Sequence, residues 1–577
     1  MNKKKGMLFA FIGFAVAASC ALAFIINANK SVSYSDGTWN GTGDGRNGPI
    51  EVSVTIENGK IVCADILRES ETDFAKPAIR AVLDQAVAKG LMNSFDAVSG
   101  ATISSKATFD AVRNALNAAS GKTGSEEEVK DTSCDIVVVG AGGAGLSSAI
   151  KISQENRKVI LLEKMGVAGG NTISATGGLN AAETRIQKEL GIEDTKEQFF
   201  KDTMKGGYNL NIPELVKNMT EKAPETVEWL MELGVDLSDV GKMAGSTNSR
   251  THRPKGGASI GAHMIPVLEE AAKNVGVDLR KNSKVVDIIS ENGKAAGVIV
   301  ETKNGKQYKI MAKAVIIASG GFGANPEMVV KYKSNLDGFG TTNHKGATGD
   351  AFAWVEKFNA QLIQMDQIQT HPTVVPGNGI MITEAVRGNG AIMVNREGNR
   401  FGSEMATRDV MSAAVLSQTG KTAYLVFDTS VRKSLKAIEG YVKKGLLTEG
   451  ETPEALAEKL GMPKEALAQT IAKYNKYVQD GNDPEFGRKA SEMPRQLNEA
   501  PYFAVEVGPA IHHTMGGIKI NEKAEVLDAK DNAIPGLYAA GEVTGGIHGG
   551  NRLGGNAVAD ICVYGKIAAE SALKYIE

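Results

Sequence analysis

The spacing of apolar residues changes several times along this chain of 577 residues. In residues 50–56 every second position is apolar, which is the period of a half-buried strand. Asn58-Gly59 follows and a second apolar run begins at once, so the pattern predicts a hairpin with a tight turn. Helical spacing comes next, in residues 79–87 and 109–116. These elements predict a small α+β domain over residues 35–120.

After a polar linker at residues 121–131, the apolar residues 136–139 predict a fully buried strand. The α/β character that begins there runs to about residue 365 and returns near the end of the chain. Between these parts the pattern is mainly helical, for example at Thr452-Pro453-Glu454, which is typical of a helix start. We therefore predict one α/β domain in two segments and a third domain inserted into it, with the bounds 132–365 and 491–577 for the former and 366–490 for the latter.

The N-terminus reads as a membrane segment, which we assign to residues 1–30. Three lysines precede the apolar residues 7–26, a run about long enough to span a bilayer. The lysines would stay inside, so the rest of the chain is expected outside the cytoplasm. Retention as an anchor, cleavage near Ala21-Leu22-Ala23 and lipid attachment at Cys20 remain open. Retention at the cell membrane is favoured because the apolar run continues past Cys20.

Composition narrows the function mainly by exclusion. A net charge of −2 gives no reason to expect nucleic acid as a partner. The four cysteines form no CxxC pattern, which argues against a disulfide framework, an iron–sulfur cluster and c-type haem. The 66 glycines suit loops that cradle a nucleotide, and no metal site is expected.

A dinucleotide-binding unit begins directly after the strand at residues 136–139. Gly140, Gly142 and Gly145 supply a tight turn, close approach of the backbone to a pyrophosphate, and close packing of helix on strand. The helix that follows would direct its free N–H groups at the phosphates. Glu163 ends the next strand, where a carboxylate can accept hydrogen bonds from ribose hydroxyls.

Two further segments favour FAD by resemblance. Residues 169–178 resemble the flavin-contacting loop of the fumarate reductase and succinate dehydrogenase flavoproteins, and residues 536–542 resemble a second FAD segment in which Glu542 binds the ribityl chain. Membrane succinate dehydrogenases bond FAD covalently to a histidine in the first loop, where this chain has no histidine, so the resemblance implies noncovalent FAD. It extends over about 130–577 and is strongest for the soluble fumarate reductases of the flavocytochrome c type. In the first loop it implies contacts from Gly170, Asn171, Thr172, Gly177 and Gly178.

The chemistry of reducing a dicarboxylate alkene explains the residues between 371 and 408 and those near 512 and 552. Two carboxylates must be held at opposite ends, for which bidentate arginine, histidines and a hydroxyl are suited. Hydride from reduced FAD reaches one alkene carbon, and the other carbon then needs a proton. The resemblance implies that Arg408 donates this proton and that Glu384 and Arg387 resupply it. It implies the following substrate contacts: Arg552 and His512 on one carboxylate, His371 and Thr383 on the other, and Met381, with Met243 more loosely, pressing on the substrate.

A second flavin signature precedes the dinucleotide unit. Residues 96–104 resemble the acceptor pattern of FMN-binding domains, in which a dedicated flavin transferase uses FAD as donor and attaches FMN to a threonine. Thr102 is the acceptor that this resemblance implies, and the glycine-rich residues 39–49 resemble the same family. A serine-rich turn before a helix, capped by Ser104 or Ser105, is the plainer interpretation. FMN in this position would replace the haems of the flavocytochrome c relatives.

We therefore expect an α/β protein: a Rossmann-like FAD-binding domain with an inserted α+β capping (clamp) domain, preceded by a small α+β FMN-binding domain. Electrons from a membrane-side donor, a quinol or a flavin dehydrogenase system, would pass through FMN to FAD and then to fumarate, giving succinate. Another α,β-unsaturated acid of the urocanate, acrylate or cinnamate type is an open alternative. Further alternatives are an oxidase, which the FMN domain argues against, and an electron-transfer protein without a small-molecule substrate.

Overall fold

In the computed structural model the chain forms two compact units, residues 1–127 and residues 128–577. The predicted leader and residues 96–100 of the acceptor pattern lie outside the described residues. In the described part, no helix is both long and apolar enough to cross a bilayer. The structure describes residues 34–46, 48–71, 74–90, 101–121 and 130–577.

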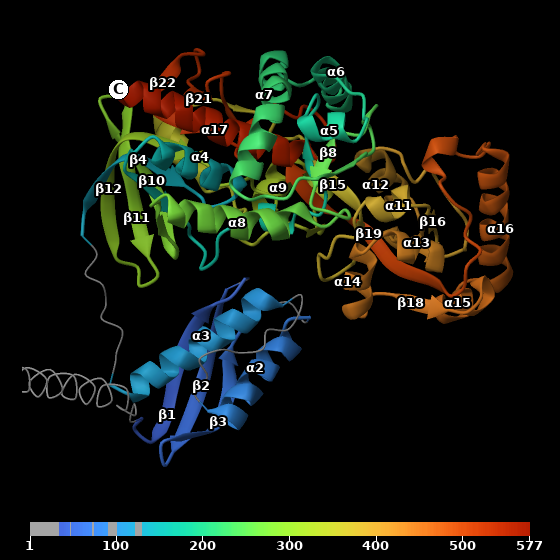
Figure 1. The fold of residues 1–577 in the computed structure, drawn as a ribbon, viewed down its shortest axis with the longest axis horizontal. Helices are drawn as coiled ribbons and strands as arrows, with labels where there is room; N and C mark the ends of the chain where they lie inside the picture. The colour runs from blue at the N-terminus through green and yellow to red at the C-terminus, as the bar shows by residue number, and fades with distance from the viewer. Residues whose placement is uncertain (1–33, 47, 72–73, 91–100, 122–129) are drawn as a thin grey trace, which may run out of the picture. The chain divides into compact units, whose positions relative to one another are not determined.

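The first unit is a three-stranded antiparallel sheet with two helices packed on it (Figure 1). The predicted hairpin is confirmed, and its turn residues Asn58 and Gly59 both have positive φ, at 51° and 71°. Glycine is required at Gly41 and Gly43, because a Cβ there would lie 2.0 Å and 1.9 Å from backbone oxygens of the second helix. The elements are β1 (Gly37–Asp44), β2 (Pro49–Glu57), β3 (Lys60–Arg68), α2 (Lys76–Lys89) and α3 (Thr102–Ala119).

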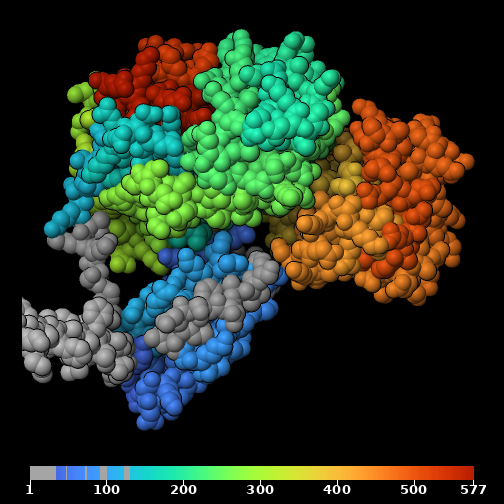
Figure 2. All heavy atoms as spheres, viewed as in Figure 1, coloured from blue at the N-terminus to red at the C-terminus, as the bar shows by residue number. Residues whose placement is uncertain are grey.

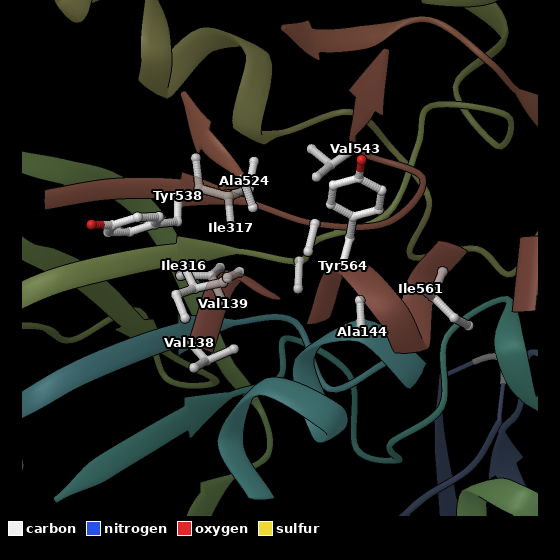
Figure 3. Packing of buried hydrophobic residues seen from close by; sticks show 14 of the residues in the cluster. Val138, Val139, Ala144, Ile316, Ile317, Ala524, Tyr538, Val543, Ile561 and Tyr564 are labelled. Atoms are coloured by element: carbon white, nitrogen blue, oxygen red, sulfur yellow. The ribbon is translucent and has the colours of Figure 1, made fainter. Parts of the chain in front are cut away.

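The second unit is centred on an eight-stranded sheet whose middle strands run parallel. These strands are almost continuously apolar, as expected for a parallel sheet covered on both faces. Figure 3 shows Val138 and Val139 packed near Ile316 and Ile317 in this core. The strands are β4 (Thr132–Val139), β5 (Val159–Leu162), β9 (Asp278–Arg280), β10 (Ser283–Glu291), β11 (Lys294–Thr302), β12 (Gln307–Ile317), β21 (Glu525–Leu527) and β22 (Ala533–Ala539).

Helices and two small sheets surround this sheet. The longest helix, at the C-terminus, packs against the helix that follows β4. The helices are α4 (Gly143–Gln154), α5 (Arg185–Glu189), α6 (Lys196–Gly206), α7 (Pro213–Glu232), α8 (Ile260–Asn274), α9 (Pro326–Tyr332), α10 (Ala351–Val355) and α17 (Asn556–Ile576). The small sheets contain β6 (Leu179–Asn180), β7 (Asp239–Gly241), β8 (Thr251–Arg253), β14 (Leu362–Ile363), β20 (Gly517–Lys519) and β23 (Thr544–Gly545).

A separate lobe with its own apolar core lies beside the main sheet of this unit (Figures 1 and 2). Its six-stranded sheet is arranged around the long strand β19, and Thr452 caps one of its helices as the sequence predicts. The strands are β13 (Gly340–Thr341), β15 (Ile368–Val374), β16 (Ile392–Val394), β17 (Ala423–Asp428), β18 (Thr448–Gly450) and β19 (Tyr502–Thr514). The helices are α11 (Ala385–Gly388), α12 (Arg408–Leu416), α13 (Thr429–Ser434), α14 (Ala437–Lys443), α15 (Pro453–Leu460) and α16 (Lys464–Asp480).

This arrangement confirms the predicted fold class. The second unit is an α/β body with a parallel sheet and a strand–glycine loop–helix unit at its start. An α+β lobe is inserted into it, and a small α+β unit precedes it in the chain. Single-turn 3₁₀ helices complete the described elements: η1 (Thr172–Ser174), η2 (Ser334–Leu336), η3 (Glu356–Phe358), η4 (Thr419–Lys421) and η5 (Ala490–Glu492).

Candidate active site

The glycine loop between β4 and α4 has the geometry that a bound pyrophosphate needs. Gly140 has φ of +102°, and a Cβ on it would lie 2.4 Å from the Ala318 carbonyl oxygen. A Cβ on Gly145 would lie 1.8 Å from the carbonyl oxygen of Gly140, so this glycine lets helix and strand touch. Gly142 differs, because a Cβ there would have no neighbour closer than 3.9 Å, and the residue lines a cavity. Two glycines therefore serve packing and one leaves space for a ligand.

Glu163 fixes the loop from the end of β5. Its Oε2 accepts a hydrogen bond from the Ala141 N–H and its Oε1 accepts one from the Met165 N–H, both at 2.9 Å. Burial raises the pKa of this carboxyl, and these two backbone donors act in the opposite direction. Each carboxylate oxygen has a second lone pair, so Glu163 can still accept from a ribose hydroxyl at the wall of the cavity.

Asn171 and Glu542 join the two segments that resemble FAD contacts. The Asn171 amide donates to Glu542 Oε2 at 2.9 Å and to Asn343 Oδ1 at 2.7 Å. Thr172 accepts a hydrogen bond from the Gly143 N–H at 3.2 Å, which connects this loop to the start of α4. Asn171 has no nucleophilic nitrogen, and its amide is already engaged in holding the loop.

These residues line one cavity with an empty volume of about 860 Å³. Glycine backbone, the N-terminus of α4 and the carboxyl groups of Glu163 and Glu542 meet in it, a donor and acceptor set that fits a dinucleotide with a flavin end. Gly177 and Gly178 lie outside the cavity: Gly177 faces Met243, and Gly178 packs on the backbone of His252. Of the predicted cofactor residues of this unit, the cavity is lined by Gly140, Gly142, Glu163, Gly170, Asn171, Thr172 and Glu542.

The side chain of Arg408 lies in a second, strongly positive region that adjoins this cavity at Glu542 and His513. Its Nε donates to Glu384 Oε2 at 3.0 Å, and its Nη1 donates to the Gln369 side-chain oxygen at 3.1 Å. His513 Nδ1 lies 3.6 Å from Glu542 Oε1, which links the two regions. Arg408 is the first residue of α12, so the capping lobe contributes it to the site.

Gln369 connects Arg408 with Arg552, which comes from the loop before α17. The same Gln369 oxygen accepts from Arg408 Nη1 and from Arg552 Nη2, at 3.1 Å each. The Gln369 amide donates to Asn551 and to the Arg552 carbonyl, so its orientation is fixed. In the described part of the chain, the buried Nε of Arg552 has no hydrogen-bond partner. Burial first, and then the charge of Arg408, lower the pKa of Arg552 to about 9.

His371 and His512 lie together on the wall of the same region. Their ring centroids are 5.0 Å apart, and the Thr342 hydroxyl is 2.8 Å from His512 Nδ1. Burial and the charge of Arg408 hold the pKa of both imidazoles well below the usual value, so both are neutral. Among the described residues, none forms a hydrogen bond with His371 Nε2. A neutral ring can donate through one nitrogen, which suits a carboxylate oxygen.

Glu384 and Arg387 extend the network of ion pairs from Arg408 into the capping lobe. Glu384 Oε2 lies 3.7 Å from Arg387 Nη2 and 3.0 Å from Arg408 Nε, so one carboxylate oxygen bridges two guanidinium groups. Burial alone would raise the pKa of Glu384, but the charges of Arg408 and Arg387 outweigh it and the pKa is lowered. Burial lowers the pKa of Arg387, whereas the charge of Glu384 raises it.

The remaining predicted substrate residues, Met243, Thr383 and Met381, differ in their burial and in their contacts. Met243 is buried against Gly177 and Gly554, and a Cβ on Gly554 would also lie 3.4 Å from Arg408 Nη2. Thr383 is buried next to Glu384, and its backbone N–H donates to the Tyr441 hydroxyl at 3.0 Å. Met381 is half-buried in the hairpin that leads to Thr383.

Hydrogen bonds and ion pairs thus join Arg408 to Glu384 and Gln369, Gln369 to Arg552, and Glu384 to Arg387. Burial and the charges of Arg408 and Arg552 lower the pKa of both His371 and His512. Thr383 and Met381 stand one and three residues before Glu384 in the chain.

Two structural partners of the site, Gln369 and Glu404, were not predicted from the sequence. Gln369 stands two residues before His371, and its importance follows only from its hydrogen bonds to Arg408 and Arg552. Glu404 is fully buried and holds the Arg387 guanidinium through its backbone oxygen. Its carboxylate accepts from Arg400 and Arg488. A buried charge has to be paired, so the position of Glu404 between Arg400 and Arg408 in the sequence could have indicated an ion pair with an arginine.

Thr102 is exposed and is the first residue of α3 in the first unit. Within the described residues, the N-cap residue Ala101 makes no side-chain cap, and no acidic residue stands in the first turn of α3, so its leading N–H groups suit a phosphate group. Two residues further on, the hydroxyl of Ser104 donates to buried Glu71 at 2.5 Å instead of capping the helix. Ser105 also lies inside α3, which begins at Thr102, so the prediction that Ser104 or Ser105 caps the helix is wrong. The turn itself, residues 96–100, lies outside the described residues.

The fold and the cavity define the second unit as an FAD-binding oxidoreductase. A family model described as "FAD binding domain" matches residues 135–558, and one described as "FMN-binding domain" matches residues 45–117. The chain belongs to the FAD-dependent fumarate reductase flavoproteins. The fumarate reductase (cytochrome) of Shewanella frigidimarina is 49% identical over 442 residues, which cover 76% of this chain and 77% of that protein.

Two further relatives add to this picture. The urocanate reductase of Eggerthella lenta is 34% identical over 598 residues, covering 98% of this chain and 97% of that protein. The solved open conformation of a flavocytochrome c3 fumarate reductase has a TM-score of 0.68 and 43% identity, and the match covers 78% of this chain and 79% of that chain. The likeness to the first relative and to this structure covers about three quarters of the chain.

Proposed function

We propose that this protein reduces fumarate to succinate. The observation that carries the proposal is the pair of guanidinium groups, Arg408 and Arg552, that share the oxygen of Gln369 beside the flavin cavity. Burial and the charge of Arg408 lower the pKa of Arg552 in spite of the opposing charges of Glu542, Glu384 and Asp560, so positive charge remains in excess at this guanidinium. A dicarboxylate would compensate this excess and supply the hydrogen-bond partner that Arg552 Nε needs.

Each end of the substrate has its own set of donors in this proposal. Arg552 and His512 bind one carboxylate, while His371 and Thr383 bind the other. Neutral imidazoles support this assignment, because burial and Arg408 lower the pKa of both histidines. A carboxylate held at both ends and pressed by Met243 and Met381 can be turned out of conjugation with the alkene, which makes the alkene easier to reduce.

Protonation falls to the chain's own residues. FAD in its reduced form would supply hydride, held noncovalently between the α4 N-terminus, Glu163, Asn171 and Glu542. Arg408 gives a proton to the alkene carbon that does not accept hydride. Glu384 returns a proton to Arg408 across 3.0 Å and receives one from Arg387, whose Nη2 is 3.7 Å away. An arginine is a weak acid, but the carbon it protonates is a far stronger base.

We assign the delivery of electrons to the first unit. Thr102 carries FMN through a phosphoester formed by a flavin transferase, and the exposed position of Thr102 at the start of α3 supports this. Residues 1–30 tether the chain to the cell membrane with the two units outside the cytoplasm. A membrane-side quinol or flavin dehydrogenase system donates the electrons. The remaining proposed bounds are 35–120 for the FMN-binding domain, 121–131 for the linker, 132–365 with 491–577 for the FAD-binding domain, and 366–490 for the capping domain.

Reduction of another α,β-unsaturated acid is the second candidate, because the urocanate reductase matches nearly the full length of the chain. The fully buried His371 and the buried Thr383 favour a second carboxylate over an imidazole. For this reason we propose fumarate as the substrate.

Oxidation of a reduced viologen dye tests the proposal. Fumarate, acrylate, cinnamate and urocanate are offered in turn, with succinate measured as product. We expect rapid dye oxidation with fumarate, and turnover with any other acid alone would overturn the assignment. Replacement of Thr383 with Val should raise the KM for fumarate several-fold more than that for acrylate, since only fumarate has a second carboxylate to lose a donor.

A further inference from the structure

The loop that follows α6 contacts both segments that carry the arginines of the site. Tyr208 lies in this loop, and its hydroxyl donates to Asp409 Oδ2 at 2.5 Å. Asp409 is the residue next to Arg408 in the first turn of α12. The bond therefore crosses from the FAD-binding part of the unit to the capping lobe, at the turn that presents the proton donor.

Tyr208 interacts with Thr407 and Asp409, the residues directly before and after Arg408. Burial raises the pKa of the Tyr208 phenol, the bond to Asp409 raises it further, and the side chain of Thr407 acts in the opposite direction. A phenol with a raised pKa keeps its proton and remains a donor at neutral pH. Because Thr407 and Asp409 both interact with it, the phenol constrains the backbone of the residue between them.

The same loop is also fixed to the segment that leads to Arg552. The Ile212 N–H donates to the Gly546 carbonyl at 2.7 Å, and the Gly550 N–H donates to the Gly207 carbonyl at 2.9 Å. The buried side-chain amide of Asn211 donates to the Ile547 carbonyl at 2.8 Å. The loop is thus fixed to the segment that leads to Arg552, and the Tyr208 hydroxyl joins the same loop to the first turn of α12.

The backbone of Tyr208 has an uncommon conformation. Tyr208 and Asn209 have φ of +59° and +56°, a left-handed region that residues other than glycine seldom adopt. The Tyr208 side chain is half exposed, with 50% of its surface accessible, so burial of an aromatic ring does not explain this conformation. Backbone strain of this kind is typical of segments that hold a functional group in place.

We propose that Tyr208 is a positioning residue that holds Arg408 against the substrate by fastening the first turn of α12 to the loop after α6. The inference rests on the proposed role of Arg408 as proton donor. Its immediate consequence is that loss of this one hydroxyl slows proton donation without weakening substrate binding.

Replacement of Tyr208 with Phe in the full-length holoenzyme tests this. We expect kcat with fumarate and reduced viologen to fall between about 10- and 100-fold, the range for a displaced catalytic group, with KM within about twofold. The solvent deuterium isotope effect on kcat should rise, because proton donation becomes more rate-limiting. Tyr575→Phe, a similarly exposed tyrosine at 42% in α17, is the matched control and should behave as the unaltered protein.

A double-substitution cycle assigns the effect to the bond. Asp409→Ala should reproduce the loss of kcat, Asp409→Asn should recover part of it because its amide oxygen still accepts, and Tyr208→Phe with Asp409→Ala should cost no more than either alone. Additive losses, or an unchanged kcat in Tyr208→Phe, would overturn the proposal. So would a loss of FAD or of thermal stability that accounts for the lower rate.

Amide hydrogen exchange separates failure of this inference from failure of the proposed function. Exchange in residues 408–416 should be faster in Tyr208→Phe than in Tyr575→Phe, whatever acid the enzyme reduces. Unchanged exchange would overturn the proposal that Tyr208 fastens α12 to the loop after α6. An unaltered protein that does not turn over fumarate would instead end the proposed function, and the exchange result would still decide whether Tyr208 fastens α12.

Discussion

The flavin cavity and the arginine site adjoin each other, yet their polar groups are satisfied in opposite ways. In the cavity, Glu163 already accepts from two backbone N–H groups, and Asn171 and Glu542 bond to each other. In the arginine site, the described structure gives no hydrogen-bond partner to buried atoms of Arg552 and His371. Glu163, Asn171 and Glu542 are therefore hydrogen-bonded without a ligand. The arginine site instead holds like charges together and would gain stability from an anion.

This difference predicts different consequences of substitution. Changes in the cavity should act through packing and cofactor retention, because its groups support the fold. Changes in the arginine site should act on rate and on pH dependence while the fold persists, since its charges oppose folding rather than support it. The four predictions below test this contrast, beginning with the largest expected effect.

Replacement of Arg408 with Ala should lower kcat for fumarate by about 10³-fold or more, because general acid catalysis contributes up to about 10⁴-fold and the bridge to Glu384 is lost as well. FAD content should stay the same. Arg396→Ala is the matched control, since Arg396 lies on the surface of the same lobe, bonded to Glu506, and should lose less than about twofold. A fall of only a few-fold in Arg408→Ala would remove this residue from the chemistry.

The glycine loop offers a paired test of the cavity. Gly145→Ala brings a Cβ to 1.8 Å from the Gly140 oxygen, so Tm should fall and FAD should be lost together. Gly142→Ala meets nothing within 3.9 Å and should leave Tm of the FAD-free protein unchanged. It should still weaken FAD binding, since crowding a fitted site costs about 1–3 kcal/mol. Calorimetry and flavin titration measure both, and equal behaviour of the two variants would contradict the assignment of Gly142 to the ligand.

The same contrast explains how much the sequence could predict. The glycine loop and the carboxylate that fixes it come from one stretch, in which β4, the glycine loop, α4 and Glu163 follow in order, so local spacing was enough to predict this part of the cavity. The arginine site takes residues from β15, α12, β19 and the loop before α17, and only resemblance to a family joined them. Gln369 and Tyr208 could not be found in this way, because their importance lies in contacts between segments that the sequence separates by 183 and 201 residues.

The pH dependence of kcat/KM should reveal the lowered pKa of Arg552. Its pKa is lowered to about 9, and only the protonated form binds a carboxylate strongly. The value of kcat/KM for fumarate should therefore fall as pH rises through about 9, by about tenfold per unit above it, because this ratio follows the free enzyme. The bound carboxylate favours the charged form, so kcat should fall less. Flavin absorbance monitors integrity of the protein, and a flat kcat/KM up to pH 10.5 would show that burial and the charge of Arg408 do not lower the pKa of Arg552 to this value.

The smallest effect on dye-driven turnover is expected from a substitution in the first unit, residues 1–127. Thr102→Ala should abolish the covalent flavin fluorescence of the denatured protein, while activity with a reduced dye stays within about twofold, since dye can reduce FAD directly. Thr38→Ala is the matched control, because Thr38 is an exposed threonine of the same unit on β1, and it should keep its fluorescence. Oxidation of the membrane-side donor should stop only in Thr102→Ala. If dye-driven turnover stopped as well, the division between an electron-delivering unit and a self-sufficient catalytic unit would be wrong, because the FAD site would then depend on the modified threonine.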